Sequence, residues 1–350
     1  MSAKILKLDP TNFNQDLLKE PADILANGGL VIIPTETVYG IAANKLNLKT
    51  LDKLYEIKKR PENKHFSLHI ADKFEVESFA IDIPVSAYKL MDKFWPGPLT
   101  LVLKSKEKNT IGIRLPDDKI AQALIQMSSV PIVCPSANIS GKPAPKNFID
   151  AIEDFKDSVD FAIDAGPTKL QLESSVVDLT INPPNILREG VIKKEDILKT
   201  VQTKNILFVC TGNSCRSVMA EAYLKKLLKD KTDVKINSAG ISALEGMSAT
   251  YNTIEVLKKI DLDVTGHRAK FLTDVMLKSS DLILVMEKHH QDLILERVPL
   301  IKNHVYLLKE FAKIDDGFYD IKDPIGQSPD VYEEVFNSIK QAVDRIAKLI

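Results

Sequence analysis

NILFVCTGNSCRS, residues 205–217, is the stretch that decides the fold of the second half of this chain. Its beginning is apolar enough for a short buried strand, and residues 219–224 continue into a helix. Cys210 and Arg216 stand six positions apart in the loop between them. A helix N-terminus favours an anion there, either a substrate phosphate or the thiolate of Cys210, through its unpaired N–H groups and its dipole. The stretch therefore predicts a phosphate-binding loop with a cysteine nucleophile; the alternative is that Cys210 is only a small buried hydrophobe.

Strand and helix patterns alternate after this loop. We expect strands at residues 235–240 and 281–286, and helices at residues 253–260 and 272–278. Such alternation is typical of a doubly wound parallel sheet, in which ligands bind at the carboxyl ends of the strands. The ligand of the second half is therefore expected beside Cys210, where the first strand ends.

The chain has 350 residues, which is long for one domain and comfortable for two. A polar break at residues 198–204 precedes the loop-bearing half. We therefore predict two domains, residues 1–200 and residues 204–350.

Composition excludes several classes of protein. The 47 basic side chains balance the 48 acidic ones, so charge alone predicts no strong direct binding to nucleic acid. No stretch approaches the ~20 apolar residues of a membrane span, and residues 1–10 lack the apolar core of a signal peptide. Three cysteines, two of them in the loop, cannot form a disulfide framework. Together these features predict a cytoplasmic protein without membrane association.

The second half resembles the low-molecular-weight phosphotyrosine phosphatase family over about 145 residues. The matching motifs are residues 210–217, Ser238-Ala239-Gly240 and Asp323-Pro324. The resemblance implies that Cys210 attacks phosphorus while Arg216 and the loop amides hold the phosphate oxygens. It further implies that Ser217 hydrogen-bonds the thiolate, and that Asp323 protonates the leaving group and then activates water.

Two further loop residues receive roles from this resemblance. Asn213 would brace the loop through side-chain hydrogen bonds, although an ordinary turn asparagine is the alternative. Cys215 would face Cys210 and trap an oxidised nucleophile as a reversible disulfide, although simple packing explains it equally well.

The residue at position 214 bears on the substrate. Tyrosine phosphatases of this family carry a bulky aliphatic residue there, whereas the protein-arginine phosphatase branch carries threonine, and this chain has Ser214. A small hydroxyl residue leaves room for a phosphoguanidinium group. Ile325-Gly326 also stands where eukaryotic members carry stacking tyrosines. Phosphoarginine and phosphotyrosine both remain open, since serine is not threonine and Val218 replaces the usual proline. Arsenate reduction is disfavoured, because no cysteine follows Cys215.

Cations mark the first half. A strand at residues 30–33 leads into Pro-Thr-Glu-Thr-Val-Tyr-Gly, residues 34–40, and a helix at residues 51–59 ends before Arg60-Pro61. Lys58, Arg60 and Arg114 are able to converge on a polyphosphate, although a solvated basic helix end is the alternative. No Walker loop or Gly-x-Gly-x-x-Gly motif is present to identify a nucleotide site.

Residues 15–198 resemble the threonylcarbamoyl-adenylate synthase family, whose fold is the YrdC-like α+β domain with a twisted mixed sheet. The match rests on seven runs in order: residues 34–40, 58–61, 94–100, 113–116, 135–141, 174–178 and 187–190. The chain departs from the family at residues 64–66, where Lys-Pro-Leu is usual.

This second resemblance implies a reaction. Family members condense threonine, bicarbonate and ATP into threonylcarbamoyl-AMP and pyrophosphate, the donor for a tRNA adenosine modification (t6A37) completed by other t6A proteins. Mg²⁺ enters through the phosphates, and no side chain is expected to ligate a metal directly. The roles implied are phosphate binding by Lys58, Arg60 and Arg188, nucleotide contact by Ser136 and Asn138, and contact with threonine and its carbamate by Thr35, His69, Arg114 and Ser175.

Together the two halves predict a bifunctional enzyme. The rival for the first half is an RNA- or nucleotide-binding module without turnover, and for the second half a regulatory phosphate sensor. A buried core histidine is the alternative for His69, and an ordinary turn residue is the alternative for Asp323.

Overall fold

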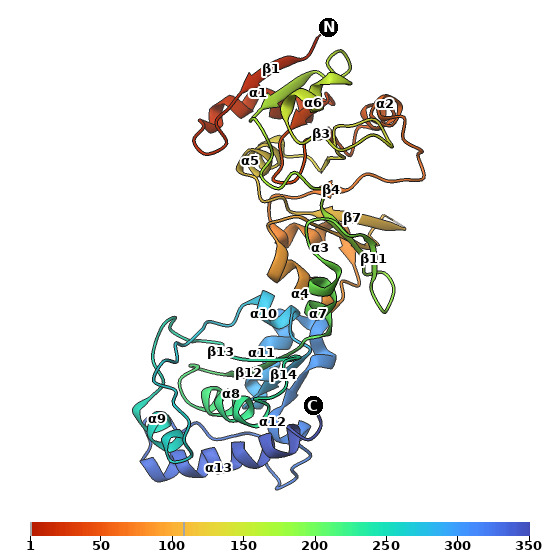
Figure 1. Cartoon of the computed structure of the whole chain (residues 1–350). Coiled ribbons are helices and arrows are strands. Elements are labelled where there is room, and N and C mark those ends of the chain that lie inside the picture. The colour runs from red at the N-terminus through yellow and green to blue at the C-terminus, as the bar shows by residue number, and fades with distance from the viewer. Residues whose placement is uncertain (1, 108) are drawn as a thin grey trace. The chain divides into compact units, whose positions relative to one another are not determined.

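The computed structural model describes residues 2–107 and 109–350, and the chain divides into two compact units, Met1–Leu198 and Lys199–Ile350 (Figure 1). The division falls close to the predicted boundary near residue 200. The predicted polar break at residues 198–204 is wrong in one respect, because α7 (Lys194–Gln202) continues through most of it. Acidic residues in the first turn of α7 and Lys199 in its last turn complement the helix dipole, and Ile197 is buried, so this polar stretch is helical.

Eleven strands in the described part of the first unit form one mixed sheet, in the order β1-β9-β2-β3-β8-β4-β7-β6-β10-β11, with β5 paired to β6. The strands are β1 (Lys4–Lys7), β2 (Val31–Ile33), β3 (Gly40–Asn44), β4 (Leu68–His69), β5 (Ala80–Ile81), β6 (Leu99–Ser105), β7 (Thr110–Arg114), β8 (Ile132–Val133), β9 (Phe161–Asp164), β10 (Ser175–Asp178) and β11 (Asn185–Arg188).

The helices that precede α7 are η1 (Gln15–Leu18), α1 (Lys19–Ala26), α2 (Leu48–Lys58), η2 (Lys73–Glu75), α3 (Val76–Phe79), α4 (Val85–Phe94), α5 (Lys119–Ser128) and α6 (Phe148–Glu153). The strand period of two distributes the core over both faces of the sheet. Val31 and Ile33 pack with residues of α1 and α5, while Leu30 and Ile32 pack in a second cluster with residues of α2 and α6.

The second unit contains a four-stranded sheet of order β13-β12-β14-β15, in which every pairing is parallel. Its elements are β12 (Lys204–Cys210), α8 (Arg216–Leu227), β13 (Val234–Gly240), α9 (Tyr251–Lys258), α10 (Asp274–Lys278), β14 (Leu282–Val285), α11 (Lys288–Arg297), η3 (Pro299–His304), β15 (Val305–Leu307), α12 (Leu308–Phe311) and α13 (Pro329–Ile346).

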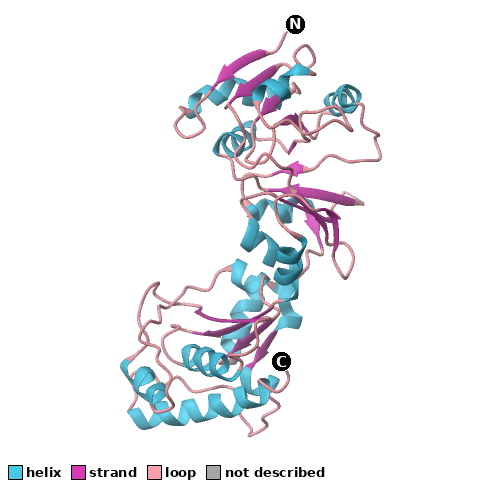
Figure 2. Cartoon of the chain, viewed as in Figure 1, coloured by secondary structure: helices cyan, strands magenta, loops and turns pink. Residues whose placement is uncertain are grey.

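Helices cover both faces of this sheet (Figure 2). Ile206 and Phe208 of β12 pack in one core cluster with residues of α8, α9 and α13, while Leu207 and Val209 pack in another with residues of α11. The predicted doubly wound parallel sheet of the second unit is confirmed, as is the predicted mixed sheet of the first unit.

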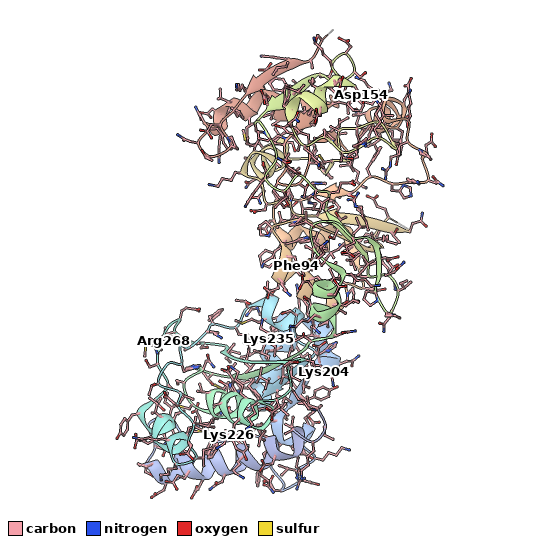
Figure 3. The ribbon with its side chains drawn as sticks, in the orientation of Figure 1. Phe94, Asp154, Lys204, Lys226, Lys235 and Arg268 are labelled. Carbon is pink, nitrogen blue, oxygen red and sulfur yellow. The ribbon has the colours of Figure 1, made fainter. Side chains whose placement is uncertain are left out.

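The strand direction fixes where a ligand binds in the second unit. Lys204 and Lys235, labelled in Figure 3, lie at the amino ends of β12 and β13, which pair in parallel register. Cys210 ends β12 at the opposite edge, beside Gly240 at the end of β13. The loop that follows Cys210 therefore lies at the carboxyl edge of the sheet.

None of the helices in the described ranges combines the length and apolar character that crossing a bilayer requires.

Candidate active sites

The loop between β12 and α8 is backed by the end of β13. Cys210 O accepts from Ile241 N at 3.0 Å, and Thr211 O accepts from Ser242 N at 2.9 Å. A Cβ at Gly240 would lie 2.5 Å from Thr211 O and 2.8 Å from Asn213 N. Only glycine permits this approach, which explains the Ser-Ala-Gly motif beside the loop.

Asn213 occupies the left-handed region with φ +50° and is fully buried. Its Nδ2 donates to Ser217 Oγ at 2.9 Å and to Ser238 Oγ at 2.7 Å, and its Oδ1 accepts from Lys270 N at 2.9 Å. Because the whole amide is used, the side chain acts as a brace across the loop.

Cys210 is buried, and its Sγ lies 3.0 Å from Ser217 Oγ. Since Ser217 Oγ already accepts from Asn213, its own proton is free to point at the sulfur. This arrangement stabilises a thiolate, as does the N-terminus of the twelve-residue helix α8.

Arg216 is buried and held from three sides. Its Nη1 donates to Glu287 and, at 2.8 Å, to Ile321 O, while its Nη2 donates to Asp323. A buried guanidinium requires such partners. The N–H groups that meet carboxylates here are of the kind that bind phosphate oxygens in an Arg–phosphate pair. Arg216 and Asp323, distant in sequence, are therefore brought together.

Sequence reasoning missed Glu287 and His290, which lie at the same edge of the sheet. Thr211 Oγ1 and His290 Nε2 are joined by a 2.9 Å hydrogen bond. Burial, together with the neighbouring His289 and Arg216, lowers the pKa of His290 to about 3. Glu287 follows the end of β14, the neighbour of β12, by two residues, and His290 lies in the first turn of α11, so their position at a carboxyl edge was the available signal.

Ser214 and Cys215 lie on the helix side of the loop. Cys215 Sγ lies 3.4 Å from Thr250 Oγ1 and 3.7 Å from Tyr332 OH, and all three cysteines are free. Ser214 is partly exposed, and its carbonyl accepts from Thr250 N at 3.0 Å. The sulfur of Cys215 thus has packing partners of its own, and its redox role stays a prediction.

The first unit contains a cavity of about 690 Å³. Six of the nine site residues predicted in this half line it: Thr35, Arg60, His69, Arg114, Ser136 and Arg188. Lys58, Asn138 and Ser175 do not.

Arg114 ends β7 and is buried in the cavity wall. Its Nη2 donates to Thr37 Oγ1 at 2.8 Å and lies 2.7 Å from Glu36 Oε1. Thr35 Oγ1 lies 2.8 Å from Thr37 Oγ1 and donates to Val38 O at 2.6 Å. Because the buried Glu36 compensates its charge, the guanidinium is fixed in place.

His69 of β4 pairs with Arg114 of β7 in parallel register. Burial lowers its pKa to about 3, and the positive charge of Arg114 contributes to the same shift. His69 therefore presents a neutral imidazole to the cavity at physiological pH.

Arg60 and Arg188 add two more cations. Arg60 donates to the carbonyls of Lys64 (Nε, 2.7 Å) and His65 (Nη2, 3.1 Å). Arg188 Nε donates to Ser174 O at 2.9 Å, and its Nη1 pairs with Glu173. With Arg114, three guanidinium groups line one cavity, which suits an anionic ligand.

Lys58 acts behind the cavity wall. Its buried Nζ donates to the carbonyls of Ser136 and Asn138, the latter at 2.6 Å. Burial, with a contribution from Arg60, lowers the pKa of Lys58 to about 8. Ser136 Oγ donates to Asn138 Oδ1, so Asn138 supports the wall residue Ser136.

Ser175 requires a correction, because it is fully buried away from the cavity. Its Oγ donates to Ile192 O at 2.7 Å and accepts from the amides of Gly190 and Ile192. The preceding Ser174 lines the cavity instead, within 3.1 Å of Arg188 Nη2. Because adjacent residues of an extended chain face opposite sides, shifting the predicted position by one residue exchanges the cavity-lining serine for the buried one.

Family models match both units. Residues 23–190 match Sua5_yciO_yrdC, described as Telomere recombination, and residues 205–350 match the low molecular weight phosphotyrosine protein phosphatase model. Both resemblances drawn from sequence are thereby confirmed.

Relatives match the same halves. The chain is 38% identical over 200 residues to a putative threonylcarbamoyl-AMP synthase of Methanocaldococcus jannaschii, covering 54% of this chain and 94% of the relative. It is 38% identical over 143 residues to a protein-arginine-phosphatase of Geobacillus stearothermophilus, covering 41% and 93%. The threonylcarbamoyl-AMP synthase of Pyrococcus abyssi is 42% identical over 189 residues, covering 51% of this chain and 56% of the relative. The chain thus spans little more than half the length of that synthase.

Two solved structures share the fold. Sua5 of P. abyssi complexed with L-threonine is 26% identical with a TM-score of 0.54, covering 82% of this chain and all of that one. YciO of E. coli is 27% identical with a TM-score of 0.51, covering 55% and 97%.

Proposed function

We propose that this chain, which belongs to the Sua5/YciO/YrdC family through residues 23–190 and to the low molecular weight phosphotyrosine protein phosphatase family through residues 205–350, is a bifunctional enzyme. The first unit is a threonylcarbamoyl-AMP synthase and the second a cysteine-dependent protein phosphatase. One observation supports each: three arginines around a cavity in the first, and Cys210 hydrogen-bonded to Ser217 in the second.

The synthase reaction needs positioning and charge more than a nucleophilic side chain. The threonine amine and bicarbonate give a carbamate and water, and an oxygen of the carbamate then attacks the α-phosphorus of ATP. The bond to pyrophosphate breaks, and threonylcarbamoyl-AMP remains. Negative charge spreads over the phosphates, and Arg60, Arg188 and the Mg²⁺ that ATP carries as part of the substrate offset it.

Threonine and its carbamate bind at the inner end of this proposed site. Arg114 receives a carboxylate, with Thr35 and the neutral His69 beside it. Ser174 is added to the predicted residues and Ser175 is withdrawn from direct contact. Lys58 and Asn138 act through the wall at Ser136, where the nucleotide binds.

Labelled bicarbonate tests this proposal. With ATP and threonine, the purified chain is expected to incorporate the label into an adenylate and to release pyrophosphate in a 1:1 ratio. Arg60→Ala should lose this activity, while Lys49→Ala, an exposed cation of α2, the helix that ends before Arg60, should retain it. If the chain binds the nucleotide but releases no pyrophosphate in response to threonine, the first unit is a binding module and the proposal is contradicted.

The phosphatase reaction proceeds in two steps. The Cys210 thiolate forms a bond to phosphorus as the bond to the leaving group breaks, and Asp323 in its acid form gives that group its proton. Arg216 turns from the carboxylates to the phosphate oxygens, and the loop amides bind the rest. Water then attacks the phosphorus of the phosphocysteine and gives a proton to Asp323. The bond from sulfur to phosphorus breaks, inorganic phosphate leaves, and the Cys210 thiolate is restored.

Phosphoarginine is the substrate we favour, since Ser214 leaves space in the loop and protein-arginine-phosphatases are among the relatives. Peptides carrying phosphoarginine or phosphotyrosine distinguish the two, with Cys210→Ser as the blank. Loss of an arginine preference in Ser214→Ile would support the role of that position. A tyrosine preference in the wild-type protein would contradict it.

We place the protein in the cytoplasm, where reducing conditions suit its three free cysteines. Its product would pass to the other proteins of t6A synthesis, and its second substrate would be a phosphorylated protein.

A further inference from the structure

A cluster of metal-binding side chains adjoins the phosphate loop without belonging to its chemistry. Glu287 precedes α11, and His289 and His290 lie in its first turn. Each offers one ligand atom, and the three atoms lie within 4.8 Å of one another. Two imidazoles and a carboxylate are a donor set that zinc and similar transition metals prefer.

The state of His290 is a second, independent observation. The residue is fully buried, and within the described ranges its Nδ1 has no hydrogen-bond partner. Its Nε2 is bonded to Thr211 Oγ1 at 2.9 Å. If Nε2 carries the proton and donates it to Thr211, then Nδ1 presents a lone pair, which is the pattern of metal-ligating histidines. Without a metal, a buried unpaired nitrogen has a cost that the fold would otherwise avoid.

Glu287 is able to serve two partners at once. Its Oε1 pairs with Arg216, and its Oε2 lies 2.9 Å from His289 Nδ1. His289 is half exposed, so its ring can rotate and admit an ion between it and the carboxylate. The pair Glu287–Arg216 does not have to break for this to happen.

We propose that Glu287, His289 and His290 form a binding site for a divalent transition metal of the zinc class, beside the phosphate loop. The dipole at the start of α11 and the charge of Arg216 both oppose a cation here. The ion must therefore bind strongly to imidazole, which excludes Mg²⁺.

The metal and an oxyanion in the loop should bind cooperatively. An ion on Oε2 draws charge from Glu287 and weakens its hold on Arg216, and it adds positive charge next to the loop. Both effects leave Arg216 more available to an oxyanion. By linkage, an oxyanion in the loop tightens metal binding by the same factor.

Zinc titration of the full chain tests the site. Cys210→Ser is the background, because a thiolate also binds zinc. One equivalent is expected to bind, and His289→Ala or Glu287→Gln should weaken it at least about 10-fold. His65→Ala removes an exposed histidine of the first unit and is the matched control, so it should leave the zinc affinity unchanged. Equal affinity with and without His289 would overturn the proposal.

Two measurements sharpen the result. Thr211→Val should weaken zinc binding by about 10- to 100-fold, as loss of an outer partner of a ligating histidine does. Sulfate, which forms no precipitate with zinc, should tighten it through Arg216, whereas sulfate that weakens it would contradict the coupling. Neither readout needs catalysis, so the metal site can fail while the proposed phosphatase stands, and the reverse.

Discussion

The two candidate sites of this chain assemble their proposed anion-binding groups in opposite ways. In the second unit, the loop from Cys210 to Ser217 brings backbone amides, a nucleophile and an arginine together within eight consecutive residues. In the first unit, the arginines come from positions as far apart as Arg60, in the loop after α2, and Arg188, at the end of β11. The difference teaches that the groups proposed for covalent catalysis come from one short loop, whereas the groups proposed to position a substrate come from distant parts of the chain.

The largest effect should come from the nucleophile. Cys210→Ser is expected to lower kcat/KM of phosphoryl hydrolysis by about 10⁴-fold or more, because no other group replaces the thiolate. Pyrophosphate release by the first unit should be unchanged in the same preparation. An equal loss of both activities would contradict this prediction, since it would mean that the two sites are not independent.

A buried ion pair should dominate the stability of the first site. Arg114→Gln leaves Glu36 buried without its partner, which is expected to cost about 3–5 kcal/mol in free energy of unfolding. Trp95 is the single tryptophan and is buried in the first unit, so urea unfolding followed by its fluorescence reports on that unit. Glu36→Gln combined with Arg114→Gln should recover much of the loss. No difference between the single and double variants would show that the pair is not coupled.

Loss of the loop brace should have a smaller effect. Asn213→Ala removes the donors to Ser217 and Ser238 and is expected to lower kcat/KM of hydrolysis by about 10²-fold, because the loop loses its geometry. Asn337→Ala, an exposed asparagine of α13, is the matched control. A normal rate in Asn213→Ala would mean that the backbone alone shapes the loop.

The smallest effect should appear in the pH dependence of the first site. The pKa of Lys58 is about 8, below its usual value because of burial, so its charge is lost as the pH rises through 8. We expect kcat/KM for ATP to fall by up to about 10-fold above this pH, and the Lys58→Met variant should not show this fall. Between pH 8 and the ordinary lysine pKa the unfolded chain binds more protons, so Lys58 makes stability rise with pH there. If kcat/KM of Lys58→Met still falls above pH 8, the fall belongs to the titration of another group.

Sequence predicted the local features of this molecule well. The strand before Cys210 and the helix after it are both present, because apolar periodicity and a helix start are encoded in neighbouring residues. The hydrogen bonds expected of Asn213 and Ser217 are present, while the roles of the two residues in catalysis stay predictions.

Long-range relations escaped prediction for physical reasons. Glu287 reaches Arg216 only because β14 pairs with β12, and strand order is not written in local periodicity. Ser174 and Ser175 exchange roles because the facing of each depends on where β10 begins. Lys58 supports the wall from behind, which a pattern of cations does not reveal.

The central claim is that one chain carries two independent catalytic sites. The most direct test assays wild-type, Cys210→Ser and Arg188→Ala proteins for threonine- and bicarbonate-dependent pyrophosphate release and for phosphopeptide hydrolysis. We predict that each variant loses one activity and retains the other. Pyrophosphate release that is absent from the wild type, or that does not require threonine, would contradict the account.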